Sequence, residues 1–287
     1  MKNALILLII SSLCLMCQRV VPTNTKLMKG SLCGVNLGDD YETYLNNIIQ
    51  LQEKQPIKNK KRINFPIKVH FVSANETEIL SKIEVKNAIA NVNQSFLTSN
   101  IQFRWDETID YLQENVLVDN IYHDGNLEEK IIADSYDKSV INLYILANYR
   151  DIVGYTHYPI LNINRIFMSH SKLQDASLVH EFGHFFGLLH TFEYTLSSAE
   201  SVNDTNCQTK GDKICDTPAD PFGASFLEDE CKLFGEYHDN FGKTFQPDMS
   251  NFMSYYGHCR IHFSQIQADR MYFIAARIKY PQMRAGV

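Results

Sequence analysis

The chain has 287 residues, of which 45% are hydrophobic, and this is enough for one domain with a substantial core and a further segment at one end. Its formal net charge is −6, with 27 basic and 33 acidic side chains, and its one basic run, residues 58–62, is short. These values exclude a protein that binds nucleic acid or an anionic membrane surface through a general excess of positive charge.

Residues 1–17 have the pattern of an export signal. Lys2 gives a positive start, and residues 4–16 form an apolar run that only two serines interrupt. Because a run of 13 residues cannot cross a hydrocarbon core, which needs roughly 20, we expect a cleaved signal peptide rather than an anchor. The alternative is a lipid on Cys17 that anchors the protein at the cell surface, for which Met16 is a poor preceding residue. The chain is therefore predicted to be secreted, and to meet a membrane only if Cys17 is lipidated.

Residues 18–62 are expected to form a segment separate from the main domain. They carry several turn formers from residue 22 onward, one possible short helix over residues 41–52, and Pro56 just before the basic run. Little in this segment can build a core.

The main domain begins at residue 63 with a change in pattern. Residues 65–72 alternate apolar and polar side chains as a half-buried strand does, and residues 76–97 have helical spacing after a possible cap at Asn75 or Thr77. Further strands are expected at residues 101–105, 140–147 and 164–169.

The second half of this domain is expected to be largely irregular. A helix is predicted over residues 175–186, then about 70 residues rich in Gly, Pro, Asp and Asn, and a closing helix over residues 264–279. A loop region of that length needs disulfides or bound ions to hold it. The order of the elements, strands and a helix before an irregular half, predicts an α+β fold.

One stretch of eleven residues carries the pattern of a zinc site. Residues 180–190 read His-Glu-Phe-Gly-His-Phe-Phe-Gly-Leu-Leu-His. His180 and His184 are four residues apart, so on a helix they lie one turn apart on the same face, where both rings can bind one metal ion. Glu181 stands beside the first ligand and can take a proton from the water that the metal activates, without itself being a ligand.

The third ligand must come from beyond this helix. Gly187 can end the helix in a left-handed conformation and turn the chain back, so that His190 reaches the metal. Three protein ligands leave a position for water, which is typical of a catalytic zinc rather than a closed structural one. The alternative, core histidines on an apolar helix, is disfavoured because five fixed positions within eleven residues rarely arise by chance.

With these residues the sequence resembles the metzincin zinc proteases, whose signature is this string followed far downstream by a methionine turn. Met253 lies in such a turn, Asn-Phe-Met-Ser-Tyr, and the Thr and Phe that follow His190 point to the pappalysin branch. Other stretches similar to that branch are residues 154–159, 211–218 and 263–271. The resemblance covers about residues 63–275.

The resemblance implies a metzincin catalytic domain over residues 63–287, with a twisted mixed sheet, an active-site helix, an irregular C-terminal subdomain and a terminal helix. It implies that Tyr255 helps to stabilise the oxyanion formed on the scissile carbonyl, with a tyrosine whose ring lies in the core as the alternative. Met253 is expected beneath the zinc as a hydrophobic floor. Basic specificity does not carry over, because His258 and Arg260 flank the last cysteine where some relatives have an acidic neighbour.

Cys33 is left over when the cysteines of the main domain are paired. It stands in Ser-Leu-Cys-Gly, and precursors in the similar family use Arg-x-Cys-Gly, whose thiolate occupies the open zinc position. The resemblance therefore implies that residues 18–62 are a pro-segment and that Cys33 binds zinc in the latent form. An inert or intermolecularly paired thiol is the alternative, and Ser31 replaces the supporting arginine. Cleavage near residues 60–62 would release the mature enzyme, unless that run is only a solvated linker.

Four cysteines in the irregular half, an even number in an exported chain, indicate two disulfides. We favour the pairs Cys207–Cys231 and Cys215–Cys259, and the other two pairings stay open.

The same half contains oxygen donors that suit calcium, namely Asp212, Asp216, Thr217 and Asp220. In the similar family this stretch contributes calcium ligands, which map to Asp212 and Thr217, with backbone carbonyls near Gly211 and Ile214. A capped polar turn is the alternative.

Together these features predict a secreted zinc endopeptidase that hydrolyses extracellular proteins or peptides and is made as a latent precursor. The alternative of another class is a zinc-bearing binding or adhesin module that no longer cleaves. Glu181 argues against it, since binding alone needs no base. A small-molecule zinc hydrolase is a third hypothesis, for which the sequence has no distinct pocket signal.

Overall fold

The computed structural model describes residues 33–34, 39–114, 125–147, 153–193, 200–221, 227–228, 231–233 and 235–284. The predictions for the signal peptide and for a lipid on Cys17 lie outside these residues. Within the described ranges, no helix combines the length and the apolar character that a membrane crossing requires.

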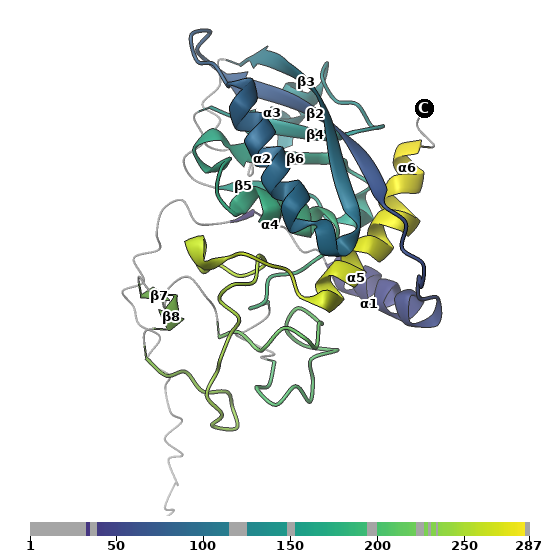
Figure 1. The fold of residues 1–287 in the computed structure, drawn as a ribbon, viewed down its shortest axis with the longest axis vertical. Helices are drawn as coiled ribbons and strands as arrows, with labels where there is room; N and C mark the ends of the chain where they lie inside the picture. The colour runs from purple at the N-terminus through teal and green to yellow at the C-terminus, as the bar shows by residue number, and fades with distance from the viewer. Residues whose placement is uncertain are drawn as a thin grey trace, which may run out of the picture.

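A mixed sheet of six strands, in the order β1-β5-β6-β4-β2-β3, forms the centre of the fold (Figure 1). The strands are β1 Cys33–Gly34, β2 Ile63–Ser73, β3 Ile101–Gln113, β4 Ile141–Leu146, β5 Gly154–Thr156 and β6 Arg165–Ser169. Only β5 and β6 pair in antiparallel fashion, and the other pairs are parallel. The predicted α+β fold with a mixed sheet is confirmed, whereas β1 and β5 were not expected from the pattern because they are only two and three residues long.

Helices cover both faces of this sheet. The helices are α1 Asp39–Lys54, which packs against α5, α2 Lys82–Ser95, α3 Gly125–Ile132, α4 Ser177–Phe185, α5 Gln265–Ile274, a π-helical segment Ala275–Lys279, and α6 Tyr280–Arg284. Alternate residues of β2, such as Phe65 and Val69, pack in the main core with α2 and α4. The residues between them face α3, where Val72 and Tyr144 form a second core with Leu127. Because successive side chains of β2 point to opposite faces of the sheet, this strand contributes to both cores.

The start of α2 differs from the expected one. Ser81 caps the helix, since its side chain accepts a hydrogen bond from the Glu84 backbone while the Glu84 side chain accepts one from the Ser81 backbone. Asn75 instead accepts hydrogen bonds from Thr77 in a turn that ends before the helix. The prediction of a cap at Asn75 or Thr77 was wrong because the capping box Ser-x-x-Glu satisfies two backbone donors and the shorter turn satisfies one.

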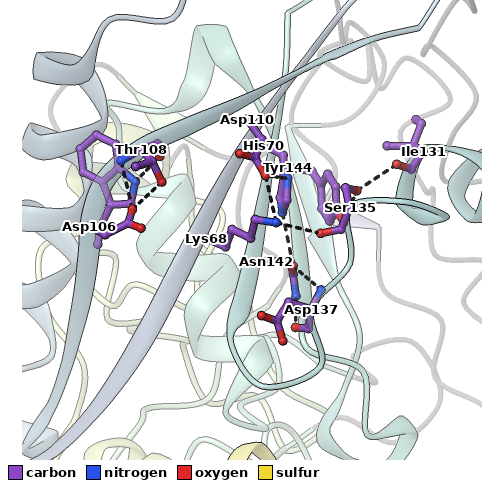
Figure 2. Close-up of polar contacts among 11 residues, drawn as sticks. Lys68, His70, Asp106, Thr108, Asp110, Ile131, Ser135, Asp137, Asn142 and Tyr144 are labelled. Atoms are coloured by element: carbon purple, nitrogen blue, oxygen red, sulfur yellow. Dashed lines mark hydrogen bonds and ion pairs between the residues drawn. The ribbon is translucent and has the colours of Figure 1, made fainter. Parts of the chain in front are cut away.

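The α3 face of the sheet also carries a buried polar group (Figure 2). His70 of β2 is fully buried, and its Nε2 lies 3.3 Å from the Asn142 side-chain oxygen of β4. Its Nδ1 faces Asp110 of β3 at 3.5 Å, and Lys68 pairs with the same carboxylate at 2.9 Å. Burial lowers the pKa of His70, so the neutral ring is the favoured form.

The stretch between α4 and α5 is largely irregular where it is described, as expected, apart from the short hairpin of β7 Leu227–Glu228 and β8 Lys232–Leu233. Its disulfides join Cys207 to Cys215 and Cys231 to Cys259. The favoured pairs Cys207–Cys231 and Cys215–Cys259 were therefore wrong. Consecutive turns over residues 204–213 fold the chain back on itself, so the first pair of Cα atoms lies only 5.0 Å apart, within the normal range for a disulfide.

Candidate metal centre

The short helix α4 brings the first two histidines of the motif together. All nine of its residues are buried, and an Asp175 carboxylate oxygen accepts a hydrogen bond from the Ser177 backbone at its start. His180 and His184 lie one turn apart with their Nε2 atoms 3.0 Å from each other. As predicted, the two rings lie on one face of the helix, with their Nε2 atoms directed at the same point.

Gly187 ends this helix and reverses the chain. Its φ is +84°, which favours glycine, and a Cβ at this position would lie 2.4 Å from the side chain of Ile274. The Leu188 N–H then returns to the Gly183 carbonyl. After this turn, the Nε2 of His190 lies 3.1 Å from that of His184. The three predicted zinc ligands thus form one buried cluster.

The donor set fits a metal ion. Each Nδ1 has an acceptor of its own, which is the carbonyl of Phe252 for His180, the carbonyl of Leu188 for His184 and the Glu193 carboxylate for His190. The protons are therefore assigned to Nδ1, and three Nε2 lone pairs face one another. Burial and the neighbouring histidines lower the pKa of His180 and of His184 well below the usual value, so neither ring is charged. Such an arrangement suits a zinc ion with three imidazole ligands.

Glu181 is almost fully buried beside β5. A Cβ on Gly154 of β5 would lie only 3.1 Å from the Cγ of Glu181, so glycine at that position leaves space for the carboxylate arm. This strand was not predicted, although its sequence lies in one of the stretches similar to pappalysins. The sheet edge therefore lies directly against the residue expected to act as the base.

The methionine turn lies against the other side of the histidines. Met253 is fully buried, and its sulfur would lie 2.3 Å from a Cβ on Gly183, so it packs directly against α4. Its carbonyl accepts a hydrogen bond from the Thr191 backbone, which joins the turn to the residue after the third ligand. The half-buried Tyr255 places its ring centroid 4.8 Å from that of His190 and 5.7 Å from that of His180.

The segment that contains Cys33 lies on the same sheet edge. In β1, Cys33 is in register with Gly154 and Gly34 with Tyr155, in a parallel pairing with β5. Since Gly154 is in close contact with Glu181, the backbone at Cys33 lies one strand away from the metal centre.

A buried acidic group lies in the irregular half. Asp212 and Glu200 are nearly inaccessible, and the Thr217 hydroxyl lies within hydrogen-bond distance of both carboxylate oxygens of Asp212 and of the carbonyl of Ile214, to one of which it donates its proton. Burial raises the pKa of Asp212 to about 8, and burial together with the charge of Asp212 raises the pKa of Glu200 to about 9. The Oε1 of Glu200 has no hydrogen-bond partner, and its other oxygen lies close to Gly211. The donor set is therefore suited to a hard cation.

Two of the other expected calcium donors have structural partners instead. Asp216 accepts hydrogen bonds from the hydroxyl of Ser264 and the backbone of Ile266, at the start of α5. Asp220 accepts them from Thr191 and Tyr256. Glu200 was missed because the sequence between it and Asp212 has no recognisable spacing.

Four further histidines pair with carboxylates outside the centre. The pairs are His157 with Glu128, His170 with Glu84, His238 with Glu236, and His262 with Asp248. Among the described residues, one further group, Cys231, His258 and Cys259, also has metal-ligand atoms close together, but its two cysteines are joined in a disulfide.

Comparison with known families gives a match over most of the domain. A model of the M43 peptidase family, described as pregnancy-associated plasma protein-A, matches residues 98–276. An extracellular metalloprotease of Neurospora crassa is 26% identical over 183 residues, which are 57% of this chain and 59% of that protein. Another, from Sordaria macrospora, is 24% identical over 233 residues, or 73% of each chain. The chain thus spans less than two thirds of the Neurospora protein.

Solved structures share the fold. Mature mirolysin of Tannerella forsythia in complex with a cleaved peptide superposes with a TM-score of 0.57 at 17% identity, over 78% of this chain and 96% of that one. A mutant of its precursor, promirolysin, superposes with a TM-score of 0.58 at 17% identity, over 88% of this chain and 97% of that one. At these identities the likeness concerns the fold alone.

Proposed function

Because the chain belongs to the M43 (pappalysin) family of metallopeptidases, we propose that it is a secreted zinc endopeptidase made as a latent precursor. The family membership confirms the predicted family and enzyme class. The observation that carries the proposal is the convergence of three Nε2 atoms whose Nδ1 protons are all directed to other acceptors. The substrates proposed are extracellular proteins or peptides, and residues 63–287 form the catalytic domain.

His180, His184 and His190 would hold the zinc, which when bound polarises the scissile carbonyl and lowers the pKa of water. Glu181 accepts a proton from the attacking water and donates it to the leaving amine. Its burial beside β5 supports this role, because a carboxylate shielded from bulk water keeps a fixed position. The Tyr255 hydroxyl donates a hydrogen bond to the developing oxyanion.

Export is supported by the names of the fungal relatives, which are extracellular metalloproteases. The proposed route is a signal peptide over residues 1–17, and a lipid on Cys17 remains the alternative.

The proposed latency rests on two contacts of the segment before residue 63. The first is β1, which adds a strand to β5, the edge next to Glu181, where a substrate strand could otherwise pair. The second is α1, whose Tyr41 stacks on Tyr158 at 4.0 Å and donates a hydrogen bond to the Gly187 carbonyl. In this proposal α1 anchors the pro-segment. The strand β1, which contains Cys33, occupies the edge of β5 where a substrate would pair.

The basic run is the proposed activation site. Lys61 and Arg62 are exposed between α1 and β2, where a protease can reach them. Cleavage there would separate both latency contacts from the catalytic domain.

A structural calcium ion is proposed at Asp212 and Thr217, with the Glu200 carboxylate as a further proposed ligand. Two buried carboxylates with raised pKa values support this assignment, the charge of Asp212 adding to the effect of burial on Glu200, because a divalent cation would stabilise both in the charged form.

The proposal is tested on the secreted chain after limited cleavage at the basic run. It should digest an unstructured protein, and lose this activity with a zinc chelator or with Glu181→Ala. Digestion that persists in the Glu181→Ala protein would contradict the mechanism, and zinc binding without any digestion would favour the non-cleaving binding module. If the Cys33→Ala precursor stays as latent as the unmutated one, Cys33 is not the switch.

A further inference from the structure

The third zinc ligand differs from the other two in what holds it. The Nδ1 atoms of His180 and His184 each lie 2.7 Å from a backbone carbonyl, that of Phe252 and that of Leu188. The Nδ1 of His190 lies 3.1 Å from a side-chain carboxylate oxygen, Oε2 of Glu193. The Tyr158 hydroxyl also lies 3.3 Å from the Nδ1 of His184, but that nitrogen keeps its backbone carbonyl, whereas a substitution of Glu193 would remove the acceptor seen at His190 among the described residues.

Glu193 is held in this position by the local backbone. Its N–H donates to the His190 carbonyl at 3.0 Å, and the same Oε2 accepts a hydrogen bond from the His190 N–H at 3.3 Å. The two side chains are only 10% and 15% exposed. Within the part of the chain that the structure describes, Glu193 forms no ion pair with a lysine or an arginine. The carboxylate of Glu193 thus interacts with His190, the third zinc ligand.

The ring of His190 has aromatic neighbours, but these do not select its orientation. Phe192 stacks on it with centroids 4.7 Å apart, and Tyr255 meets it edge-on at 4.8 Å. Stacking allows a ring to rotate within its own plane, whereas a hydrogen bond at Nδ1 fixes that rotation. It also selects the tautomer in which Nε2 carries the lone pair.

We propose that Glu193 is a positioning residue for the third zinc ligand. Its carboxylate accepts the Nδ1 proton of His190, directs Nε2 to the metal and increases the basicity of the ring. It also adds a negative charge beside a centre of three neutral imidazoles and a divalent ion. This inference rests on the proposed zinc site and concerns the affinity for the metal rather than a step of the reaction.

The test is the zinc affinity of the full chain, measured by competition with a chromophoric chelator in a Cys33→Ala background, which removes the thiol as a further ligand. Glu193→Ala should weaken zinc binding about 10- to 100-fold, because loss of such an outer partner has effects of this size. Glu193→Gln keeps an oxygen acceptor without the charge, so its loss should be smaller. Glu236→Gln removes the same charge from the exposed partner of His238, 3.9 Å away, and should leave the affinity unchanged.

A second readout separates positioning from folding. The rise in Tm on adding zinc should shrink in the order unmutated, Glu193→Gln, Glu193→Ala and His190→Ala. The KM of the Glu193 variants, measured at saturating zinc after cleavage at the basic run, should stay the same. Equal zinc affinity in Glu193→Ala and the unmutated chain overturns the inference and leaves the zinc site intact. Failure of the unmutated chain to bind zinc overturns the zinc site itself. If Glu193→Ala does not fold, unchanged affinity in Glu193→Gln together with an unchanged rise in Tm overturns the inference.

Discussion

On the α3 side of the sheet, the buried polar groups stabilise one another, whereas around α4 and the loops after it they face groups of their own kind. His70, Asn142 and Asp110 alternate donors, acceptors and charges across three strands (Figure 2). In the other region, three histidines converge, and the charge of Asp212 adds to burial in raising the pKa of Glu200. The first region is held by its own contacts, although the Nδ1 of His70 makes no hydrogen bond, and the second would be completed by the proposed ions. The proposed zinc and calcium sites therefore lie where buried nitrogen and carboxylate oxygen atoms face one another without a cation between them.

The sharpest test of this comparison is activity without loss of structure. Glu181→Gln should lower kcat/KM by about 10³-fold, because general-base catalysis contributes 10²- to 10⁴-fold. Zinc affinity and the free energy of unfolding should change little, since the amide fills the same space. Measuring all three on one preparation tests the assignment, and a protein that loses zinc as well as activity would place Glu181 among the ligands.

Calcium removal should have the next largest effect. With calcium at 100 times its Kd, the free energy of unfolding should rise by about 2.7 kcal/mol, and a chelator should reverse this. Asp212→Asn and Glu200→Gln should each reduce the gain, which urea unfolding with and without calcium measures. A gain that survives in both variants would mean that the ion binds elsewhere.

The α3 side should respond in the opposite way. His70→Ala leaves the Asn142 oxygen and Asp110 without their ring partner and opens a cavity, so the free energy of unfolding should fall by about 2 kcal/mol. Zinc affinity and the calcium effect should be unchanged, because both sites lie across the sheet or beyond it. Altered zinc binding in this variant would show that the two regions are coupled.

The smallest expected effect is at Lys279, which lies between the two regions. Its ammonium is fully buried, donates to the carbonyl of Ile163 and lies 4.2 Å from the ring centre of Phe185 in α4. Burial lowers the pKa of Lys279 from 10.5 to about 7. The unfolded chain therefore binds more protons than the folded one between these values, so stability rises with pH above 7, by about 1 kcal/mol from pH 7 to pH 8.

Lys279→Met should remove this rise. Chemical unfolding at pH 7 and pH 8 checks it, with Lys172→Met, whose side chain is 45% exposed, as the control. Identical pH dependence in Lys279→Met and the unmutated chain contradicts the assignment.

The sequence predicted those parts of the molecule that depend on local spacing. The stacking of His180 over His184 follows from the helical repeat, and the turn at Gly187 from the conformational freedom of glycine. The long strands β2 and β4 followed from alternation and from an apolar run. These features need no knowledge of contacts between distant residues.

The features that were missed depend on the path of irregular loops, on contacts between separate segments or on very short elements. The pairing of Cys207 with Cys215 depends on turns whose exact path no pattern indicates. The approach of Glu200 to Asp212 and the addition of β1 to β5 join segments that are distant in sequence. The capping box at Ser81 is an exception, because its signal was present in the sequence and the cap was nevertheless sought earlier in the chain.

The pairing of β1 with β5 has a consequence for how the precursor would respond to its surroundings. A strand that is tethered to the edge it occupies competes with any incoming peptide at a fixed local concentration, of the order of millimolar for a short connection. Dilution after export would not change the fraction of chains in which β1 occupies the edge of β5. Only a peptide at very high concentration could displace β1. Cutting the tether turns the same contact into an encounter between two molecules, which dilution then disfavours. One peptide bond would thus convert a concentration-independent block into a dissociable inhibitor.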